Sequence, residues 1–381
     1  MQRQAFVELS RRLLAHATAG TTDLAATTYS VSVADYADPD RWQAEMDRIF
    51  RRVPLVLALA GELPEPGSYK VTWVLGTPVL LTRGDDGAAR AFVDVCRHRG
   101  AVVTPEGCGR ARRHTCPYHG WTYDTNGALV GIPGREGFHE LDVASHGLVP
   151  LACGERAGLV FACITPGVAI DLDEWLSGYD EVLEPFGMGR WHLVSRREVD
   201  GANWKIVYDG YLEGYHFGSL HRDTLFGAFM SNVMAYDAWG PHQRVGFARH
   251  GIERLRDKPE SEWGDQEGIG LVCTVFPSVS FAFLPAGVLM SQLFPGPTPD
   301  RSRTVQSIFW DHEPSEPEQT DIEGIAEMLF GVVRDEDYAT GAGIQRALSS
   351  GANTEFVFGR NELGLHRFHQ TVARLLTSER V

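Results

Sequence analysis

The sequence predicts an α+β fold with two domains: an N-terminal antiparallel β domain, and a larger domain of antiparallel sheet flanked by helices. Length is the first observation behind this prediction, because 381 residues correspond to two or three domains of roughly 150 residues each. The second is the pattern of short apolar segments between glycine turns in the first half, followed by helical spacing in the second half. The third is a hydrophobic content of 43%, which is enough for a large core.

We expect a helical segment over residues 1–39 that packs on the larger domain, a β domain over 40–166 and the larger domain over 167–381. Apolar side chains recur at helical spacing in the first segment, at Phe6, Leu9, Leu13 and Leu14. In the β domain, "GDDG" from Gly84 to Gly87 predicts a hairpin, and Asn126-Gly127 predicts a second turn between strands.

"GLVFACI", residues 158–164, predicts the buried strand that closes the β domain. In the larger domain, apolar residues have helical spacing over residues 203–217. Residues 270–294 and 303–313 are typical of strands in a second sheet, and residues 321–341 and 359–376 of C-terminal helices.

Charge and composition exclude several classes of protein. The net charge of −15 disfavours binding to nucleic acid or to an anionic membrane face. Six cysteines in a chain of this length do not form a disulfide scaffold. Arg11 and Arg12 interrupt any apolar signal core, and the apolar run from Pro54 to Gly61 is too short to cross a bilayer. We therefore expect a cytoplasmic protein.

Three of the six cysteines lie in one short stretch, "CRHRGAVVTPEGCGRARRHTCPYHGW". Cys96 and His98 form C-x-H, and Cys116 and His119 form C-x-x-H. Each pair fits on one tight loop, and two such loops can close on one metal centre. Thiolates are soft ligands and imidazoles are borderline, so the set suits zinc or an iron–sulfur cluster.

The mixture of ligands within each loop favours the cluster. Structural zinc sites usually place like ligands together, whereas one Cys and one His per loop fit a [2Fe–2S] centre with two Cys on one iron and two His on the other. We expect His114 to be a surface residue. The remaining cysteines complete no ligand spacing and are expected to be small buried residues, at Cys108, Cys153, Cys163 and Cys273.

A second constellation lies in "NWKIVYDGYLEGYHFGSLH", residues 203–221. It contains His216 and His221, and two imidazoles with one carboxylate form the facial triad of non-haem Fe(II). Residues five apart lie about 140° apart on a helix, so His221 must follow a helix end or bulge, for which Gly218 supplies a break. Glu213 lies three residues before His216 and would share its helical face.

Together, "CRHRG…CPYHGWTYDTNG" and "E-x-Y-H-x₄-H" resemble the signatures of the Rieske non-haem iron oxygenases, in the large (α) subunit of the aromatic-ring-hydroxylating dioxygenase type. The resemblance covers nearly the whole chain. It implies a Rieske [2Fe–2S] cluster on the first four ligands and a mononuclear Fe(II) on His216 and His221. It also implies a carboxylate as third iron ligand, for which Asp337 is our choice and Asp335 and Glu336 are the alternatives.

The resemblance also assigns roles to two carboxylates. Glu213 would bridge His216 to His119 of a neighbouring subunit, because a carboxylate can accept hydrogen bonds from both imidazoles. Many members of the family carry Asp at this position. Asp209 is a further candidate catalytic carboxylate in the same stretch, although Gly210 stands where the family often has Asn. Electron transfer across a subunit interface would imply a homotrimer.

The function implied is that of a terminal oxygenase component that uses O₂ to hydroxylate a hydrophobic, aromatic or alicyclic, small molecule. The chain has no nucleotide-binding motif, so electrons would come from an NAD(P)H-dependent reductase, with or without a ferredoxin. Residues 224–239 are apolar, with Phe226, Phe229 and Met230, and could line the substrate pocket or belong to the core. Whether one or two oxygen atoms enter the product stays open.

Three alternatives remain at this point. Relatives also hydroxylate or demethylate quaternary amines, and Tyr236 and Trp239 could form an aromatic cage for such a cation. A Rieske electron-transfer protein without oxygenase activity would leave the second half of the chain unexplained. A zinc-stabilised binding module would be colourless.

Overall fold

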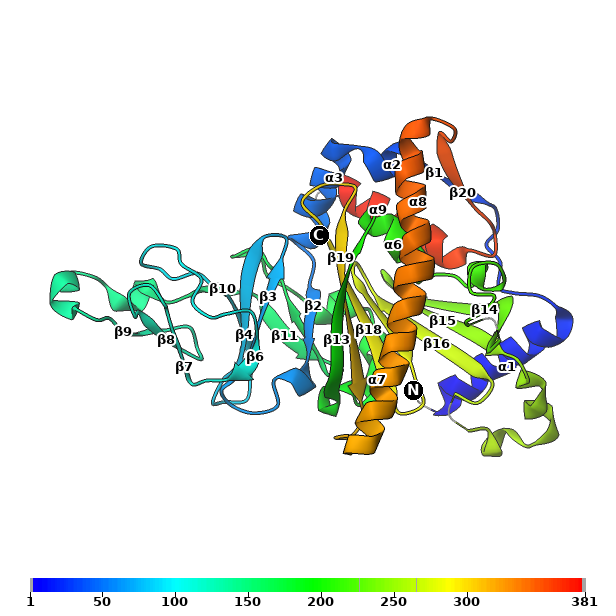
Figure 1. Cartoon of the computed structure of the whole chain (residues 1–381), viewed down its shortest axis with the longest axis horizontal. Coiled ribbons are helices and arrows are strands. Elements are labelled where there is room, and N and C mark those ends of the chain that lie inside the picture. The colour runs from blue at the N-terminus through cyan, green and yellow to red at the C-terminus, as the bar shows by residue number, and fades with distance from the viewer. Residues whose placement is uncertain (1–2, 226, 265, 379–381) are drawn as a thin grey trace. The chain divides into compact units, whose positions relative to one another are not determined.

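The computed structural model describes residues 3–225, 227–264 and 266–378 (Figure 1). These residues divide into two compact units. One unit consists of residues 50–175 and 187–192, and the other consists of the remaining described residues. The first is built from small antiparallel sheets and the second from a large sheet with helices, which confirms the predicted α+β class.

The β unit contains three antiparallel sheets. A five-stranded sheet has the order β10 (Val149–Leu151), β5 (Ala89–Val93), β4 (Thr77–Arg83), β3 (Ser68–Val74) and β6 (Gly107–Arg110). A three-stranded sheet has the order β11 (Cys153–Arg156), β12 (Leu159–Ala162) and β2 (Leu55–Leu59). Another has the order β7 (Arg113–Thr115), β8 (Thr122–Asp124) and β9 (Leu129–Gly131).

The three local predictions for this unit are confirmed. The "GDDG" turn joins β4 to β5, and its Gly84 N–H donates to the carbonyl of Ala88 (2.9 Å). Asn126-Gly127 joins β8 to β9, and Gly127 has the positive φ of 77° that the turn needs. The predicted buried strand at residues 158–164 is β12, all four residues of which are buried.

A seven-stranded sheet forms the centre of the other unit. Its strands follow the order β13 (His192–Gly201), β19 (Ser302–Trp310), β18 (Gly287–Pro295), β17 (Val279–Phe283), β16 (Ile269–Val275), β15 (His242–Arg249) and β14 (Phe229–Trp239). The pairs from β19 to β14 are antiparallel. A separate ladder pairs β1 (Tyr29–Ser32) with β20 (Glu355–Phe358).

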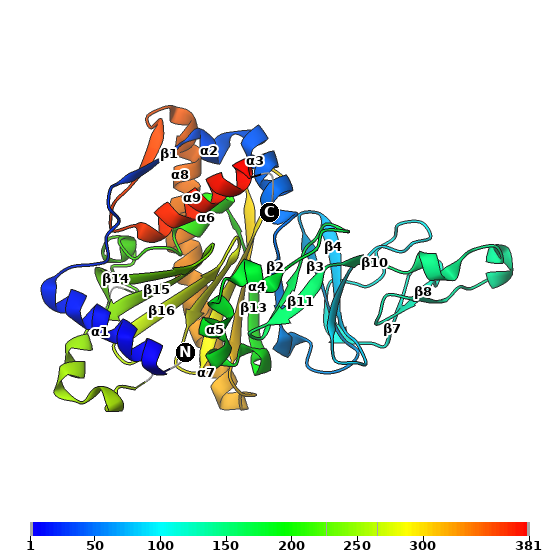
Figure 2. The same ribbon diagram turned by 180° about the vertical axis from the view of Figure 1, so that it is seen from behind.

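Helices cover both faces of this sheet. On one face, α7 (Glu316–Val332), the π-helical turn η10 (Val333–Tyr338) and α8 (Ala339–Ala347) run on from one another (Figure 1). On the other face lie α1 (Arg3–Ala19) and α9 (Leu363–Thr377) (Figure 2). Ile322 and Ala326 of α7 pack on Leu289 and Ile308 of the sheet, so the amphipathic spacing is satisfied by burial.

Shorter helices complete the fold: α2 (Ala34–Ala37), α3 (Pro39–Glu45), α4 (Leu172–Leu176), α5 (Tyr179–Leu183) and α6 (Trp204–Asp209). The structure assigns residues 40–49 to the unit of the large sheet and not to the β unit, because the buried Glu45 of α3 binds Lys205 of α6. Among the described helices, none has the length and hydrophobicity that a membrane span requires.

The predicted helical spacing over 203–217 is only partly correct. Helix α6 stops at Asp209, and a separate 3₁₀ turn, η7, covers His216–Gly218. The Glu213 carboxylate accepts the backbone N–H groups of Tyr215 and His216. This side chain therefore satisfies the backbone locally, in place of a continuing helix.

Candidate cluster and iron sites

The two loops that carry the C-x-H and C-x-x-H pairs have the same backbone hydrogen bonds. In the first loop Cys96 N–H donates to the carbonyl of Ala101 (2.8 Å), and Gly100 N–H donates to the carbonyl of Cys96 (3.0 Å). The second loop repeats both bonds at the same distances, with Cys116 in place of Cys96 and Gly120 in place of Gly100. Both glycines have positive φ, of 75° and 74°. A glycine at this position lets each loop close tightly behind its ligands.

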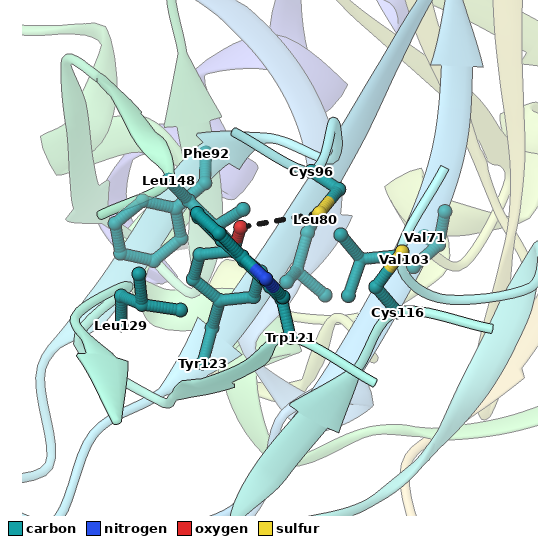
Figure 3. Close-up of a cluster of buried hydrophobic side chains, with 10 residues drawn as sticks. All are labelled: Val71, Leu80, Phe92, Cys96, Val103, Cys116, Trp121, Tyr123, Leu129 and Leu148. Carbon is teal, nitrogen blue, oxygen red and sulfur yellow. Dashed lines mark hydrogen bonds between the residues drawn. The ribbon is translucent and has the colours of Figure 1, made fainter. Parts of the chain in front are cut away.

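The four side chains meet in like pairs, cysteine with cysteine in one apolar cluster and histidine beside histidine. Both cysteines are buried within the apolar cluster that Figure 3 shows. The rings of His98 and His119 have centroids 4.6 Å apart, and His98 also stacks on Trp121 at 4.9 Å. His98 Nδ1 is buried and has no hydrogen-bond partner within the described ranges. A buried nitrogen without a partner costs free energy unless a ligand binds it.

These residues fit a [2Fe–2S] centre. Two buried thiols and two imidazoles are its donor set, and the buried His98 Nδ1 is a donor that a metal would satisfy. The Tyr123 hydroxyl lies 3.4 Å from Cys96 Sγ (Figure 3). It also accepts the Arg97 N–H at 2.9 Å. Burial raises the pKa of the Cys96 thiol. Metal ligation requires the thiolate, and hydrogen bonds such as that of Tyr123 tune its properties.

Two expectations near the loops are wrong. His114 is buried at 2% exposure, because its side chain on β7 points inward and its Nδ1 lies 3.0 Å from Thr104 Oγ1. Burial lowers its pKa. Cys108 is exposed, since β6 has all four of its residues at the surface. Cys163 and Cys273 are buried as expected, and Cys153 is half-buried.

In the other unit, three ligand-type atoms from distant segments meet. His216 Nε2 lies 3.1 Å from His221 Nε2, and Asp337 Oδ1 lies 3.7 Å and 3.2 Å from the two nitrogens. An octahedral metal about 2.1 Å from each ligand separates neighbouring donor atoms by roughly 3 Å. The three atoms therefore have the spacing of one face of a metal's coordination shell.

The other ring nitrogens of both histidines face carboxylates. His216 Nδ1 binds Glu213 Oε1, and His221 Nδ1 lies 2.6 Å from Glu336 Oε2. Each carboxylate stabilises the tautomer with the proton on Nδ1, which directs the Nε2 lone pair toward the shared position. Although burial opposes it, the hydrogen bonds and charges of Asp337 and Glu336 raise the pKa of His221 above its ordinary value. This arrangement fits a divalent iron.

The three acidic residues considered for the third ligand lie in η10 and have separate environments. Asp335 is exposed and pairs with Arg334 at 2.6 Å. Glu336 binds His221 Nδ1 and also accepts the Thr224 hydroxyl at 3.0 Å. Only Asp337 reaches both Nε2 atoms. The wide turn of a π-helix presents Glu336 and Asp337 to the same site, a use that π-helical turns often have.

The sequence did not predict that Glu336 binds His221. Glu336 was an alternative to Asp337 as the third iron ligand, and not a partner of a histidine. Asp209 lies elsewhere. Its two carboxylate oxygens bind His369 Nε2 (2.9 Å) and the Tyr36 hydroxyl (2.9 Å), and it does not join the three converging atoms. His369 is thereby a buried packing residue that links α9 to α6.

A cavity of about 140 Å³ opens beside the three converging atoms. Its wall is mostly aliphatic and aromatic, and it contains no lysine or arginine among the described residues. The hydroxyls of Tyr211 and Tyr338 lie 3.1 Å apart in it. The lining residues are Val207, Gly210, Tyr211, Glu213, His216, Phe217, His221, Leu225, Phe247, Val272, Ser280, Ala282, Leu289, Leu329, Val332, Val333, Asp337 and Tyr338.

Residues 224–239 contribute little to this cavity. Leu225 lines it, Phe229 packs with the neighbouring apolar cluster, and Phe226 lies outside the described residues. The aromatic cage considered for Tyr236 and Trp239 is not part of this cavity, since neither residue is in its lining. Tyr236 is buried with its hydroxyl on Met234 Sδ, and the Trp239 ring face is covered by the Arg244 guanidinium at 5.3 Å.

The contact between Glu336 and His221 predicts the result of a conservative substitution. Glu336→Gln keeps the shape but weakens the carboxylate's hold on Nδ1–H, so we expect iron affinity at this site to fall by about 10- to 100-fold. Titration of the apoprotein with Fe(II) under anaerobic conditions measures the change. Asp335→Asn is the matched control, since this neighbouring carboxylate faces solvent, and its iron affinity should equal that of the wild type. Equal affinity in both variants would contradict the assigned role.

Comparison with known protein families gives two matches. Residues 53–145 match the family described as "Rieske [2Fe-2S] domain", and residues 188–378, half of the chain, match "Ring hydroxylating alpha subunit (catalytic domain)". The chain is 31% identical over 203 residues to a glycine betaine monooxygenase oxygenase subunit of Chromohalobacter salexigens, which covers 53% of this chain and 44% of that protein. It is 33% identical over 228 residues to an anthranilate 1,2-dioxygenase large subunit of Burkholderia cepacia, covering 56% and 51%.

The chain thus spans about half the length of these curated relatives. A longer match, over 83% of this chain and 84% of the relative at 28% identity, is to a carnitine monooxygenase oxygenase subunit of Acinetobacter baumannii. Among solved structures, the quaternary ammonium Rieske monooxygenase CntA with L-carnitine superposes with a TM-score of 0.79 at 24% identity, covering 93% and 97%. Naphthalene 1,2-dioxygenase of Rhodococcus sp. gives 0.75 at 20%, covering 98% of both chains. At these identities the structures show a shared fold.

Proposed function

The chain belongs to the ring-hydroxylating α-subunit family of Rieske oxygenases, and we propose that it is a terminal oxygenase component for a small, uncharged, mainly apolar substrate. The observation that carries this proposal is the apolar cavity with His216, His221 and Asp337 on its wall. Its volume of about 140 Å³ resembles the roughly 150 Å³ of an apolar cavity that accepts benzene in another protein. An aromatic or alicyclic molecule with one six-membered ring is the substrate class that fits.

The proposed ligand sets are Cys96, His98, Cys116 and His119 for the [2Fe–2S] cluster, and His216, His221 and Asp337 for the iron. When bound, the cluster supplies single electrons and the iron supplies open positions for O₂ next to the substrate. The chain's own contribution is orientation and exclusion of water. Glu213 and Glu336 fix the two imidazoles, and the aliphatic wall holds the substrate against the ligands.

Electrons would reach the iron site from a neighbouring copy of the chain. Glu213 already binds His216 Nδ1 with Oε1, and His119 is exposed at the surface of the β unit. A carboxylate that accepts hydrogen bonds from both imidazoles would join the two sites, as in our expectation for a homotrimer. An NAD(P)H-dependent reductase, with or without a ferredoxin, would reduce the cluster.

A quaternary amine is the second candidate substrate. Two relatives that match half of this chain or more are named glycine betaine monooxygenase and carnitine monooxygenase. The aromatic residues of the cavity, Tyr211, Phe217, Phe247 and Tyr338, could contact a trimethylammonium group. Both named substrates also carry a carboxylate, and the described wall offers it no lysine or arginine. Burying that anion unpaired would cost free energy, which favours the uncharged class.

Matched pairs of substrates separate the two candidates. Choline and 3,3-dimethylbutan-1-ol have the same shape but differ in charge, as do glycine betaine and 3,3-dimethylbutanoate. The reduced protein would be mixed with O₂ and each of these compounds, with toluene and cyclohexane alongside, in a single turnover followed by mass spectrometry. We expect oxygenated products from toluene, cyclohexane or 3,3-dimethylbutan-1-ol, and none from choline or glycine betaine.

Each result has a distinct meaning. Formaldehyde and a demethylated product from glycine betaine would overturn the apolar assignment in favour of the second candidate. Reoxidation of the cluster without any product from the six compounds would favour an electron carrier. A colourless protein with bound zinc would remove the oxygenase proposal altogether.

A further inference from the structure

A second cavity, of about 470 Å³, lies in the same unit and opens to solvent. It is formed by the end of β13, the turn between β18 and β19, and α8. Its lining residues are Asp200, Gly201, Ala202, Gly296, Pro297, Asp300, Arg301, Ser302, Arg303, Tyr338, Ala342, Gln345 and Arg346. We call it the outer cavity, and the iron-site cavity the inner cavity. Tyr338 lines both.

Two hydrogen-bond donors are built into the interior of the outer cavity. Ser302 is 3% exposed, and its hydroxyl has no hydrogen-bond partner in the part of the chain that the structure describes. Gln345 Oε1 accepts the backbone N–H of Asn203 at 2.9 Å. This bond fixes the amide's orientation and leaves its NH₂ group free to donate toward the cavity. A buried donor without a partner in the protein indicates that a ligand atom or a water molecule accepts its hydrogen bond.

A glycine lets the end of β13 approach Ser302 closely. A Cβ atom on Gly201 would lie 2.6 Å from Ser302 Oγ and 3.2 Å from the Tyr338 ring. Any larger residue at position 201 would therefore have to displace the Ser302 side chain, which lines the cavity.

Charged groups surround the opening. Arg301 and Arg346 are exposed, and neither makes an ion pair with any described carboxylate. Arg303 differs, because it pairs with Glu198 at 3.2 Å. Asp200 and Asp300 are also exposed and belong to the same lining, so the rim carries both signs of charge. The interior donors and the two available guanidinium groups together make a site for an acceptor-rich anion.

We propose that the outer cavity binds a small organic carboxylate. A guanidinium binds a carboxylate through two parallel N–H donors, and the Ser302 hydroxyl and Gln345 amide donate from the interior. The volume lies in the range of small-molecule sites and exceeds what inorganic phosphate would fill. The rim aspartates favour a carboxylate that also carries a hydroxyl or amino group, because their oxygens can accept a hydrogen bond from that group.

The outer cavity is a separate site and not an extension of the inner one. Tyr338 forms the wall between them, and its hydroxyl is held by Thr304 at 2.7 Å and Tyr211 at 3.1 Å. It is also buried at 6% exposure. The proposal therefore does not depend on the substrate that the inner cavity accepts, nor on the proposed oxygenase activity.

Calorimetric titration of the holoprotein with succinate tests the proposal, with tartrate as the hydroxylated probe. We expect saturable binding of both, tighter for tartrate, and weaker binding of inorganic phosphate. Arg301→Gln and Arg346→Gln should each weaken tartrate binding by about tenfold or more, since each removes a charge-assisted contact. Arg367→Gln on α9 is the matched control, an exposed arginine outside the lining, and should bind as the wild type does.

His221→Ala separates this site from any binding of carboxylate at the iron. Unchanged tartrate affinity in that variant supports the outer cavity as the site, whereas loss of binding there would overturn the proposal. Absence of saturable binding in the wild type, an equal effect of all three arginine substitutions, or tighter binding of phosphate than of tartrate would overturn it as well. Ser302→Ala removes one buried hydroxyl and should weaken tartrate binding. When it is combined with Arg301→Gln or Arg346→Gln, the ratio of the tartrate affinities of those two arginine variants should stay the same.

Discussion

An Asp337→Ala variant is expected to lose turnover almost completely while it keeps the visible absorption of its iron–sulfur cluster. Asp337 Oδ1 is the single carboxylate atom among the three converging donors, and two imidazoles alone bind Fe(II) far more weakly. Loss of a residue that only supports a ligand already costs about 10- to 100-fold, so loss of the ligand should reduce turnover to below about 1%. Iron should fall by about one third relative to the wild type, with acid-labile sulfide unchanged.

Asp335→Ala is the control for this experiment. The two aspartates lie two residues apart in η10, but Asp335 is exposed and pairs with Arg334. Its removal should leave iron content and turnover unchanged. Normal iron content in Asp337→Ala, or loss of the cluster's absorption, would contradict the division into two ligand sets. Loss of turnover in both variants would instead point to a general role of η10.

The arrangement of the two proposed ligand sets was predictable from the sequence to different degrees. Cys96 and Cys116 lie on loops whose hydrogen bonds are local, so spacing alone indicated how each pair would be arranged. His221 and Glu336 are 115 residues apart, and their contact depends on how η10 packs against the turn at His216. The acidic run 335–337 was recognisable, but the geometry that gives its members different environments exists only in the folded chain.

The differences between the predictions and the structure have one local cause and one long-range cause. The spacing over 203–217 is helical, yet the Glu213 carboxylate competes for the backbone N–H groups and the helix stops at Asp209. His114 was misjudged because its surroundings come from other strands. The outer cavity was also invisible, since its lining joins three segments that are far apart in the chain.

The second large effect is expected from a buried ion pair that supports the iron-site segment. Lys205 and Glu45 have 0% side-chain exposure, and Lys205 Nζ lies 2.8 Å and 2.6 Å from the two carboxylate oxygens. Trp204 Nε1 donates to the same carboxylate at 2.8 Å. Burial lowers the pKa of Lys205, and the Glu45 charge opposes this shift. The pair joins α3 to α6, which leads directly into the stretch with His216.

Lys205→Met should lower the free energy of unfolding of the unit that contains the large sheet by about 3–5 kcal/mol. The Glu45 carboxylate would stay buried with Arg41, 3.3 Å away, as its remaining cationic partner. Glu45→Leu should cost a similar amount by leaving the ammonium group unpaired. Urea denaturation followed by far-UV circular dichroism measures both changes. The cluster's visible absorption, which reports on the β unit alone, should be lost at the same urea concentration in all variants.

The double variant Glu45→Leu/Lys205→Met decides whether the cost comes from the unpaired charge. If it does, removing both charges should recover most of the stability, with a remaining deficit of about 1–3 kcal/mol because the Trp204 N–H loses its acceptor. A deficit equal to the sum of the two single variants would show instead that the two side chains contribute independently, with no coupling between their charges. Glu260→Gln, which removes the exposed partner of Arg11, should leave the unfolding midpoint unchanged. Burial, and not the distance between the charged atoms, is the main difference between these two ion pairs, since the shortest N···O distances, 2.6 Å and 2.8 Å, are similar.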